Sequence, residues 1–391
     1  MSVNNLAIED IYQLMNSLHQ QVTSQASITP TNTADFVSLA TTTLAAGTDS
    51  VYNALMNEIG RTVFAVRPYE RKFGGLVQSA DRWGAIKRKI NYADKDIQDA
   101  EAAFHPVDGS TVDPWKINKA DIVETRYYGS DVYQDSFTVF EDQIRTAFDS
   151  PAALGSFVSG QMTNMSNKWE QYLESFNRMA LCNLIAAKYS QSADIIHLIT
   201  EYNTQTNLGT PLDANSIWQP DNIAPFFRWV RARINTLARR MAERSELFQM
   251  PITGHHIIRH TPNQDLKIYL LADALDQIDT MVNTVTYHDE PLAYADVEGV
   301  SYWQAIDNPD EIQVTPNYID GSGAVQTAAA QTLSGVFGVM FDRDAVGTNV
   351  FQYGINNSPF NPRGLYYTSW LTARLQSQLD LTEKAVILML D

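Results

Sequence analysis

The chain has 391 residues, 44% of them hydrophobic and 19% charged, and this composition excludes wholesale disorder. Asp and Glu number 45 against 28 Lys and Arg, a formal charge of −17 that argues against binding nucleic acid through the overall field of the molecule. Cys182 is the one cysteine, so neither an intramolecular disulfide nor a cysteine-based zinc site can form. No apolar run approaches the ~18 residues of a membrane span, and the first ten residues lack the pattern of a signal peptide. We therefore expect no membrane association and a cytoplasmic chain with a reduced thiol.

The N-terminal segment begins with an amphipathic helix. Its apolar residues recur every three or four positions and share one face: Ile8, Ile11, Met15, Leu18 and Val22. Residues 23–50 are rich in Thr, Ser and Ala and carry little charge. We interpret them as a flexible arm or linker, with the alternative that the arm orders against a neighbouring molecule. A short helix is expected at residues 50–59.

Residues 61–140 predict a long hairpin that projects from the body. Residues 82–92 alternate as a strand does, with Ile86, Ile90 and Tyr92 on one face and Lys87 and Lys89 on the other. Residues 122–128 and 131–140 are predicted to be the returning strands. The polar segment 93–121 lies between them, and structureless stretches of this length are usually functional or extended.

A long helix is expected to follow. Asp149, Ser150 and Pro151 form a helix start signal, in which a capping side chain precedes a proline. Apolar residues then recur every three or four positions as far as Tyr189. Even residues 161–189 alone would make a helix ~43 Å long, which indicates a structural spine.

The second half combines one more long helix with short strands. The helix is expected at residues 223–247, with an apolar face of Phe227, Val230, Ile234, Leu237 and Met241. Strands are expected at residues 266–272, 312–315 and 335–341. Residues 367–379 alternate with period two, and residues 385–390 form a continuous apolar run that is typical of a fully buried strand.

No motif in the sequence supports a catalytic mechanism. The phosphate-binding loop, the dinucleotide fingerprint and the nucleophile elbow are all missing. His255, His256 and His260 lie in a stretch that favours a strand, where His256 and His260 would be about 13 Å apart, so we expect no metal site. Cys182 lies in MALCNLIAA and is expected to be a small buried hydrophobe.

Two groups of charged residues have alternative interpretations. The acids between residues 265 and 320 predict a solvated face, with a paired-carboxylate hydrolase as the alternative. The arginines between residues 228 and 244 spread around the polar arc of their helix. This spread favours surface ion pairs or subunit contacts over nucleic-acid binding.

Several stretches resemble the major capsid proteins of tailed bacteriophages. The first is VYNALMNEIGRTVFAVRPYERKFGGL (51–76), which resembles the segment before the extended loop in short-tailed phages of Gram-positive hosts. The second is TPNQDLKIYLLADALDQIDT (261–280), which is similar to that group's axial segment. The last are FGVMFDRDAVGTNVFQYG (337–354) and WLTARLQSQLDLTEKAVILML (370–390), which are similar to the terminal strands. The order of the parts also resembles the Hong Kong 97 fold.

The resemblance implies an α+β chain with the Hong Kong 97 (HK97-like) capsid fold. It implies an N-terminal arm at residues 1–60, an extended loop at 61–140 and a peripheral domain with the spine helix at 141–205. An axial domain at 206–334 and a return to the peripheral domain at 335–391 would follow, the last strand being a candidate for the axial domain.

The resemblance also implies a function. Such subunits form hexamers and pentamers that build an icosahedral shell around packaged double-stranded DNA, which they would enclose without sequence-specific binding. Because the catalytic motifs are missing, we also expect no enzymatic activity, metal or cofactor. Scaffolding protein and portal would be further partners, and the protein would occupy the virion after assembly in the host cytoplasm. The alternatives are an encapsulin-type compartment shell and, in a different class, a carboxylate-based glycoside hydrolase.

Charge divides the predicted hairpin into a basic root and an acidic tip. Residues 61–90 carry eight basic and two acidic side chains, and residues 91–124 carry three basic and eight acidic ones. We expect the tip of one subunit to reach basic surface on the next, with solvated charge as the alternative. The residues assigned to this contact are Arg82, Lys87, Arg88, Lys89, Asp94, Asp96, Asp99 and Glu101.

Overall fold

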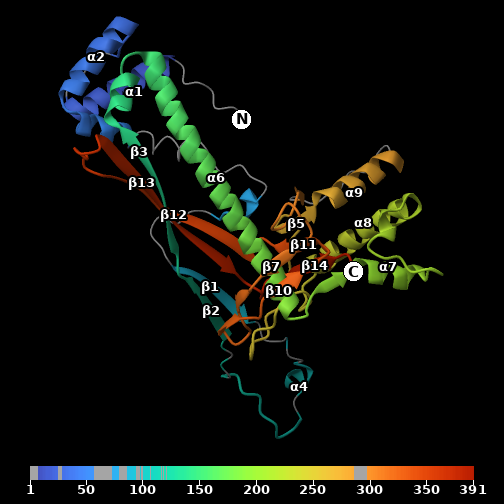
Figure 1. Cartoon of the computed structure of the whole chain (residues 1–391). Coiled ribbons are helices and arrows are strands. Elements are labelled where there is room, and N and C mark those ends of the chain that lie inside the picture. The colour runs from blue at the N-terminus through green and yellow to red at the C-terminus, as the bar shows by residue number, and fades with distance from the viewer. Residues whose placement is uncertain are drawn as a thin grey trace.

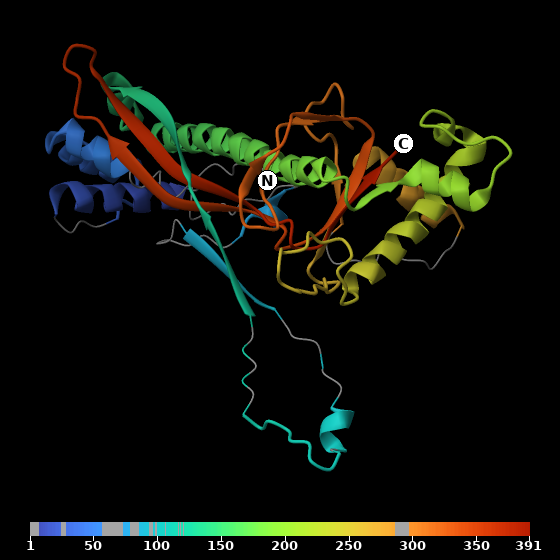
Figure 2. The same ribbon diagram turned by 90° about the horizontal axis from the view of Figure 1, so that it is seen from below.

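The computed structural model describes residues 8–24, 29–56, 73–78, 86–93, 97, 100–105, 107–115, 117, 119, 121–285 and 297–391. A long antiparallel sheet and a long helix lie side by side, with a lobe of helices at one end and a projecting loop below (Figures 1 and 2). No helix within the described ranges combines the length and the apolar character that a membrane span requires.

The long helix is α6 (Pro151–Ser190), and it starts where the sequence predicts. The Ser150 side chain caps it by accepting a hydrogen bond from the Ala153 amide at 3.2 Å, and Pro151 occupies its first turn. Its 40 residues correspond to ~60 Å. Its first half packs against the N-terminal helices, and residues 180–187 pack against the sheet at the other end. The predicted spine is therefore confirmed.

The long sheet has the order β12-β13-β3 and consists of β12 (Val346–Asn357), β13 (Tyr366–Leu379) and β3 (Asp131–Phe140). The predicted period of two is confirmed along most of β13, because Tyr367, Leu371, Ala373 and Leu375 are all buried. It fails at the end of the strand, where Gln376 and Gln378 are buried as well and Leu379 is only partly buried. β3 pairs with β13, so of the two predicted returning strands β3 belongs to the body of the protein. The helix α5 (Glu141–Ala147) connects β3 to α6.

The N-terminal segment corrects the expectation of a flexible arm. After α1 (Ile8–Thr23), residues that were interpreted as a linker form α2 (Thr33–Ala45), and a further helical stretch covers 48–56. Asn32 caps α2 by accepting from the Asp35 amide at 2.9 Å, and Phe36 is fully buried. The composition of this segment did not predict a helix, because a Thr- and Ala-rich sequence has only a weak apolar stripe. Packing against the other helices supplies the stability that the sequence pattern does not indicate.

The other end is built on a five-stranded sheet of order β4-β14-β11-β5-β6. Its strands are β4 (Ile195–His197), β14 (Ala385–Met389), β11 (Val336–Asp342), β5 (Leu266–Leu271) and β6 (Val297–Val300). One face packs on the end of α6, and the other on α7 (Leu198–Thr206), α8 (Pro220–Ala242) and α9 (Ala272–Val285). Cover on both faces explains why every residue of β14 is buried, as its apolar run predicts.

Short elements complete this end. β7 (Ile312–Val314) pairs with β10 (Gln331–Leu333), and β8 (Asn317–Ile319) pairs with β9 (Val325–Thr327). The short 3-10 helices are η1 (Gly74–Leu76) and η2 (Ser216–Trp218). The strands β11 and β14 join one sheet with β5 and β6, whereas β12 and β13 belong to the long sheet.

The predicted hairpin is formed by β1 (Ile86–Ala93) and β2 (Asp121–Tyr128). The strands are antiparallel from Ile86 opposite Tyr128 to Ala93 opposite Asp121. The described part of the connection contains the one-turn helix α4 (Glu101–Phe104) and projects away from the body in both views (Figures 1 and 2).

Candidate functional site

The hairpin has one face against the body and one face open. Exposure alternates along both strands, because side chains of a strand point alternately to opposite sides. The open face carries Ile90, Tyr92, Ile122 and Tyr128, which are 49%, 64%, 59% and 76% exposed. Tyr92 and Ile122 lie directly opposite each other in the ladder, so they form one apolar pair on the surface.

Apolar exposure continues into the loop beyond the strands. Side chains in its described part that are at least three-quarters exposed are Ile97, Phe104, Val107, Trp115 and Ile117. A two-stranded ribbon is marginally stable alone, and contiguous apolar surface of this kind usually marks a contact with another molecule. The hairpin and its loop are therefore the candidate contact surface of this chain.

The inner face holds the hairpin to the body through buried charge. The ammonium group of Lys89 donates to the carboxylates of Asp380 and Glu383, which lie in the turn between β13 and β14. Arg259 lies 3.3 Å from Glu383 and donates to the Asn91 side chain at 2.7 Å. We call Lys89, Asn91, Arg259, Asp380 and Glu383 the root cluster.

Burial decides the ionisation of groups in and beside the root cluster. Burial opposes the charge of Asp380, but Lys89 and the hydrogen bonds from Lys89 and Thr382 outweigh it and hold the pKa of Asp380 below its ordinary value. Burial, reinforced by Asp380, raises the pKa of Tyr127 on β2. Asp380 is thus a carboxylate whose charge depends on the hairpin lysine.

The structure distributes the eight predicted contact residues over different environments. Lys89 belongs to the root cluster, and Lys87 donates to Gln78, so both contact their own chain. Arg88 lies on the open face, 3.5 Å from Glu124, and Glu101 lies in α4, 3.3 Å from His105. Arg82, Asp94, Asp96 and Asp99 lie outside the described residues. Contact of any of the eight with a neighbouring subunit stays a prediction.

The sequence reasoning missed the internal partners of Lys89. Asp380 and Glu383 lie almost 300 residues further along the chain, and local pattern does not connect them to the hairpin. The apolar open face was signalled by alternation in residues 86–92, but was not recognised as the contact surface.

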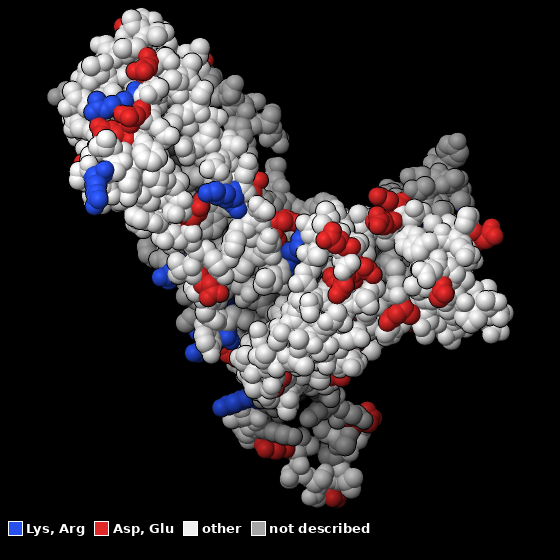
Figure 3. Space-filling view, in the orientation of Figure 1, with Lys and Arg blue, Asp and Glu red and all other residues white. Residues whose placement is uncertain are grey.

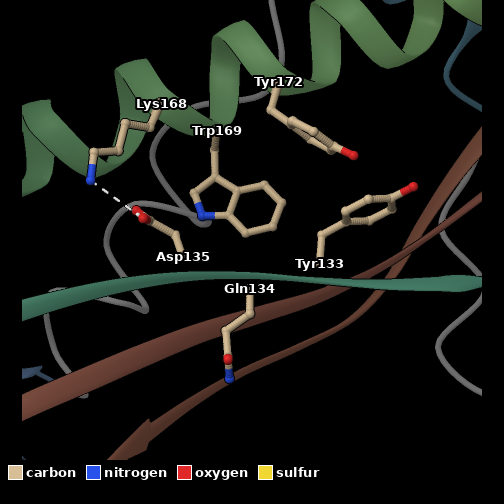
Figure 4. A pocket seen from close by; sticks show the side chains of 6 residues that line it. All are labelled: Tyr133, Gln134, Asp135, Lys168, Trp169 and Tyr172. Atoms are coloured by element: carbon tan, nitrogen blue, oxygen red, sulfur yellow. Dashed lines mark hydrogen bonds and ion pairs between the residues drawn. The ribbon is translucent and has the colours of Figure 1, made fainter.

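A cleft between α6 and β3 is the second candidate feature. Trp169 and Tyr172 point from the helix toward the strand, and Tyr133 points back toward them (Figure 4). They border a cavity of about 210 Å³, beside which Lys168 lies 3.3 Å from Asp135. The indole nitrogen of Trp169 and the second carboxylate oxygen of Asp135 are buried without a hydrogen-bond partner among the residues that the structure describes. Aromatic surface with a free donor and acceptor suits a contact surface better than a catalytic centre.

Cys182 and the histidines near residue 256, the remaining candidates for nucleophilic or metal chemistry, lie in surroundings that suit a structural role. Cys182 is 2% exposed, which confirms the small buried hydrophobe that was expected, and burial raises the pKa of its thiol to about 12. The predicted strand around His256 is wrong, since residues 251–260 are irregular with isolated bridges, and His256 instead lies 3.0 Å from Glu246. Among the described residues, no cluster of His, Cys, Asp and Glu could hold a metal ion.

Solved structures of phage capsids share this fold. The capsid of Staphylococcus phage Andhra matches 81% of this chain and 83% of that chain, with 11% identity and a TM-score of 0.54. The capsid of cyanophage P-SCSP1u covers 81% of this chain and 86% of that chain at 12% identity and a TM-score of 0.44. The match to the Andhra capsid gives this chain the Hong Kong 97 (HK97-like) fold of phage capsid proteins.

The sequence identifies the family within this class. The family model of the Phi29-like phage major capsid protein matches residues 12–389, and the chain belongs to this family. It is a structural protein of a virion shell, as the resemblance implied, and the comparisons give no support to an encapsulin or a glycoside hydrolase. The comparison with curated proteins gave no match.

Proposed function

We propose that this chain assembles into hexamers and pentamers that tile an icosahedral shell around packaged double-stranded DNA. In each ring, the open face of one hairpin and its apolar loop lie on the next copy. Scaffolding protein and portal act as further partners, and assembly takes place in the host cytoplasm. The chain has no enzymatic role in this proposal.

The observation that carries the proposal is the exposed apolar face on a projecting ribbon. Tyr92 and Ile122 are 64% and 59% exposed in the single chain, although each belongs to a residue type that is enriched in contacts or cores. Burying such a pair removes apolar surface from water at about 25 cal/mol per Å². A neighbouring copy supplies the cover, because identical rings repeat the same heterologous contact until they close.

The charge of the chain suits a container for DNA. A formal charge of −17 per copy, multiplied over a shell, repels the phosphate backbone and keeps packaged DNA from adhering to the wall. We expect binding of free double-stranded DNA to the assembled shell to be undetectable at ~150 mM salt.

Light scattering coupled to size exclusion, followed by negative-stain microscopy, tests the proposal directly. We expect ring-shaped multimers or closed shells whose fraction grows with protein concentration. A strict monomer at high concentration, even with scaffolding protein present, contradicts it.

A paired substitution tests the role of the open face. Replacing Tyr92 and Ile122 with Ser removes exposed apolar surface, so the unfolding free energy of the single chain should change by less than ~1 kcal/mol, while multimers disappear from the scattering profile. Leu208→Ser on the helical lobe, where Leu208 is 41% exposed, is the matched control and should assemble normally. Normal assembly of the Tyr92/Ile122 variant would remove the hairpin face from the proposal.

A further inference from the structure

The lobe formed by α7, α8 and α9, which we call the helical lobe, carries basic residues near one end of α8 and acidic residues of α9 near the other. Arg239 and Arg240 are exposed near the C-terminal end of α8, and neither has an ion-pair partner among the described residues. Arg239 and Arg240 therefore present two adjacent positive charges on the surface of an acid-rich chain.

The other end of the same helix lies beside an acidic cavity. Trp218 contacts Phe227 in α8, with 5.4 Å between ring centroids, and is itself 41% exposed. Together with Asp273, Asp276 and Gln277 of α9, it borders an open cavity of about 370 Å³. Asp273 and Asp276 are three residues apart, so they present their carboxylates on the same face of α9.

The chemistry of this cavity matches an arginine side chain. A guanidinium group stacks on an indole ring and donates paired hydrogen bonds to carboxylates, and a lysine ammonium does neither as well. Over the outer part of the lobe the charged side chains that are visible in Figure 3 are acidic.

The two features cannot meet within one copy. Arg239 follows Phe227 by twelve residues along α8, which separates the arginines from the cavity by ~18 Å. Complementary patches at opposite ends of one element form a head-to-tail contact between copies, and such a contact closes into a ring when the rotation allows it.

We propose that Arg239 and Arg240 of one copy dock into the cavity of Trp218, Asp273 and Asp276 on the next copy. This contact sets the register of lobes around each ring and is independent of the hairpin contact. It rests on the proposed assembly into rings. Subunit contact was one expectation for the arginines of α8, and this proposal assigns it to Arg239 and Arg240 as hydrogen-bond donors.

Charge reversal on each side provides the test in the full-length protein. The variant R239E/R240E and the variant D273R/D276R each place like charges across the contact, so each should need about tenfold more protein for half assembly than the wild type. Arg363→Glu is the matched control, because Arg363 is equally an exposed arginine but lies in the connection between β12 and β13, outside α8 and the cavity. It should assemble at the wild-type concentration.

Mixing the two variants gives the sharper readout. In a ring that alternates the two, every contact again pairs a cation with an anion, so a 1:1 mixture should recover rings with an even number of copies. Rings of five cannot alternate, and native mass spectrometry should find them missing. Assembly of either variant alone at the wild-type concentration, or no recovery on mixing, would overturn the inference.

Separate measurements distinguish a folding defect and a failure of the proposed assembly from a failure of this contact. All the substituted residues are exposed, so unfolding transitions of the variants should match the wild type, and D273R alone replaces the double variant if Asp276 proves necessary for folding. If the wild type itself forms no multimers, the proposed assembly fails. If the wild type assembles and the variants match it, this contact alone fails.

Discussion

Lys89 determines how the hairpin meets the body. Its side chain is 22% exposed and lies between two carboxylates whose side chains are less than a tenth exposed. Two buried acids at the end of β13 would repel each other without a cation, and Arg259 contacts only Glu383 directly. Lys89 from the projecting strand and Arg259 from the body thus together compensate the two buried carboxylates.

Replacing Lys89 with Met should destabilise the folded chain by about 3 kcal/mol at pH 7, because it leaves Asp380 buried and unpaired. The loss of unfolding free energy in this variant should become smaller as the pH is lowered. The pKa of Asp380 is lowered in the folded wild type, so its contribution is present above the unfolded value of ~3.9 and is lost as pH falls through the folded value. The difference between variant and wild type should therefore shrink below pH ~4.

Denaturant titrations at pH 7 and pH 3.5 measure this effect. Arg88→Met is the control, because Arg88 lies on the open face with a side chain 61% exposed and its ion pair with Glu124 contributes little. Equal losses for the two variants at pH 7 would show that the root cluster has no special role.

Among the secondary-structure elements, α6 is the longest that the structure describes, and its first residue is set by a side-chain cap. Ser150 accepts from the Ala153 amide, and without it a helix of 40 residues would begin with an unsatisfied donor. Ser150→Ala should cost about 1 kcal/mol of stability, measured by thermal or chemical unfolding.

Ser175 offers a comparison within the same helix. It is exposed in the helix interior and donates to the Gln171 carbonyl at 3.0 Å, a bond that caps nothing. Ser175→Ala should leave stability unchanged or raise it by a few tenths of a kcal/mol, because alanine is the better helix former. A larger loss at Ser175 than at Ser150 would contradict the capping argument.

At the scale of the whole molecule, separate cores occupy the two ends. One contains α1, α2 and the first half of α6, and the others surround the five-stranded sheet. α6 and the long sheet connect the ends (Figure 1). A destabilising substitution in one core should therefore lower the local stability of that end more than the stability of the other end.

Phe36→Ala tests this division. Phe36 is fully buried between the N-terminal helices, so its removal should cost about 3–5 kcal/mol and reduce amide-exchange protection in α1 and α2 while β11 and β14 keep theirs. Phe337→Ala in the sheet at the other end should give the opposite pattern. Uniform loss of protection in both variants would mean that the molecule unfolds as a single unit.

Elements with a strong local pattern follow from the sequence alone. The start of α6 follows from Ser150 and Pro151, the burial of β14 from an unbroken apolar run, and the first strand of the hairpin from alternation in residues 82–92. Each depends on residues near in sequence, where spacing maps directly onto one face of a helix or strand.

Features that depend on distant residues are set by the tertiary fold. The helix α2 exists because Phe36 and Ala40 are buried against other helices, and its Thr-rich composition does not predict that burial. The internal partners of Lys89, Asp380 and Glu383, come from the far end of the chain, while its predicted contact with a neighbouring subunit stays a prediction. The direction in which a charge points is set by what the fold places opposite it, and that information is spread over residues hundreds of positions apart.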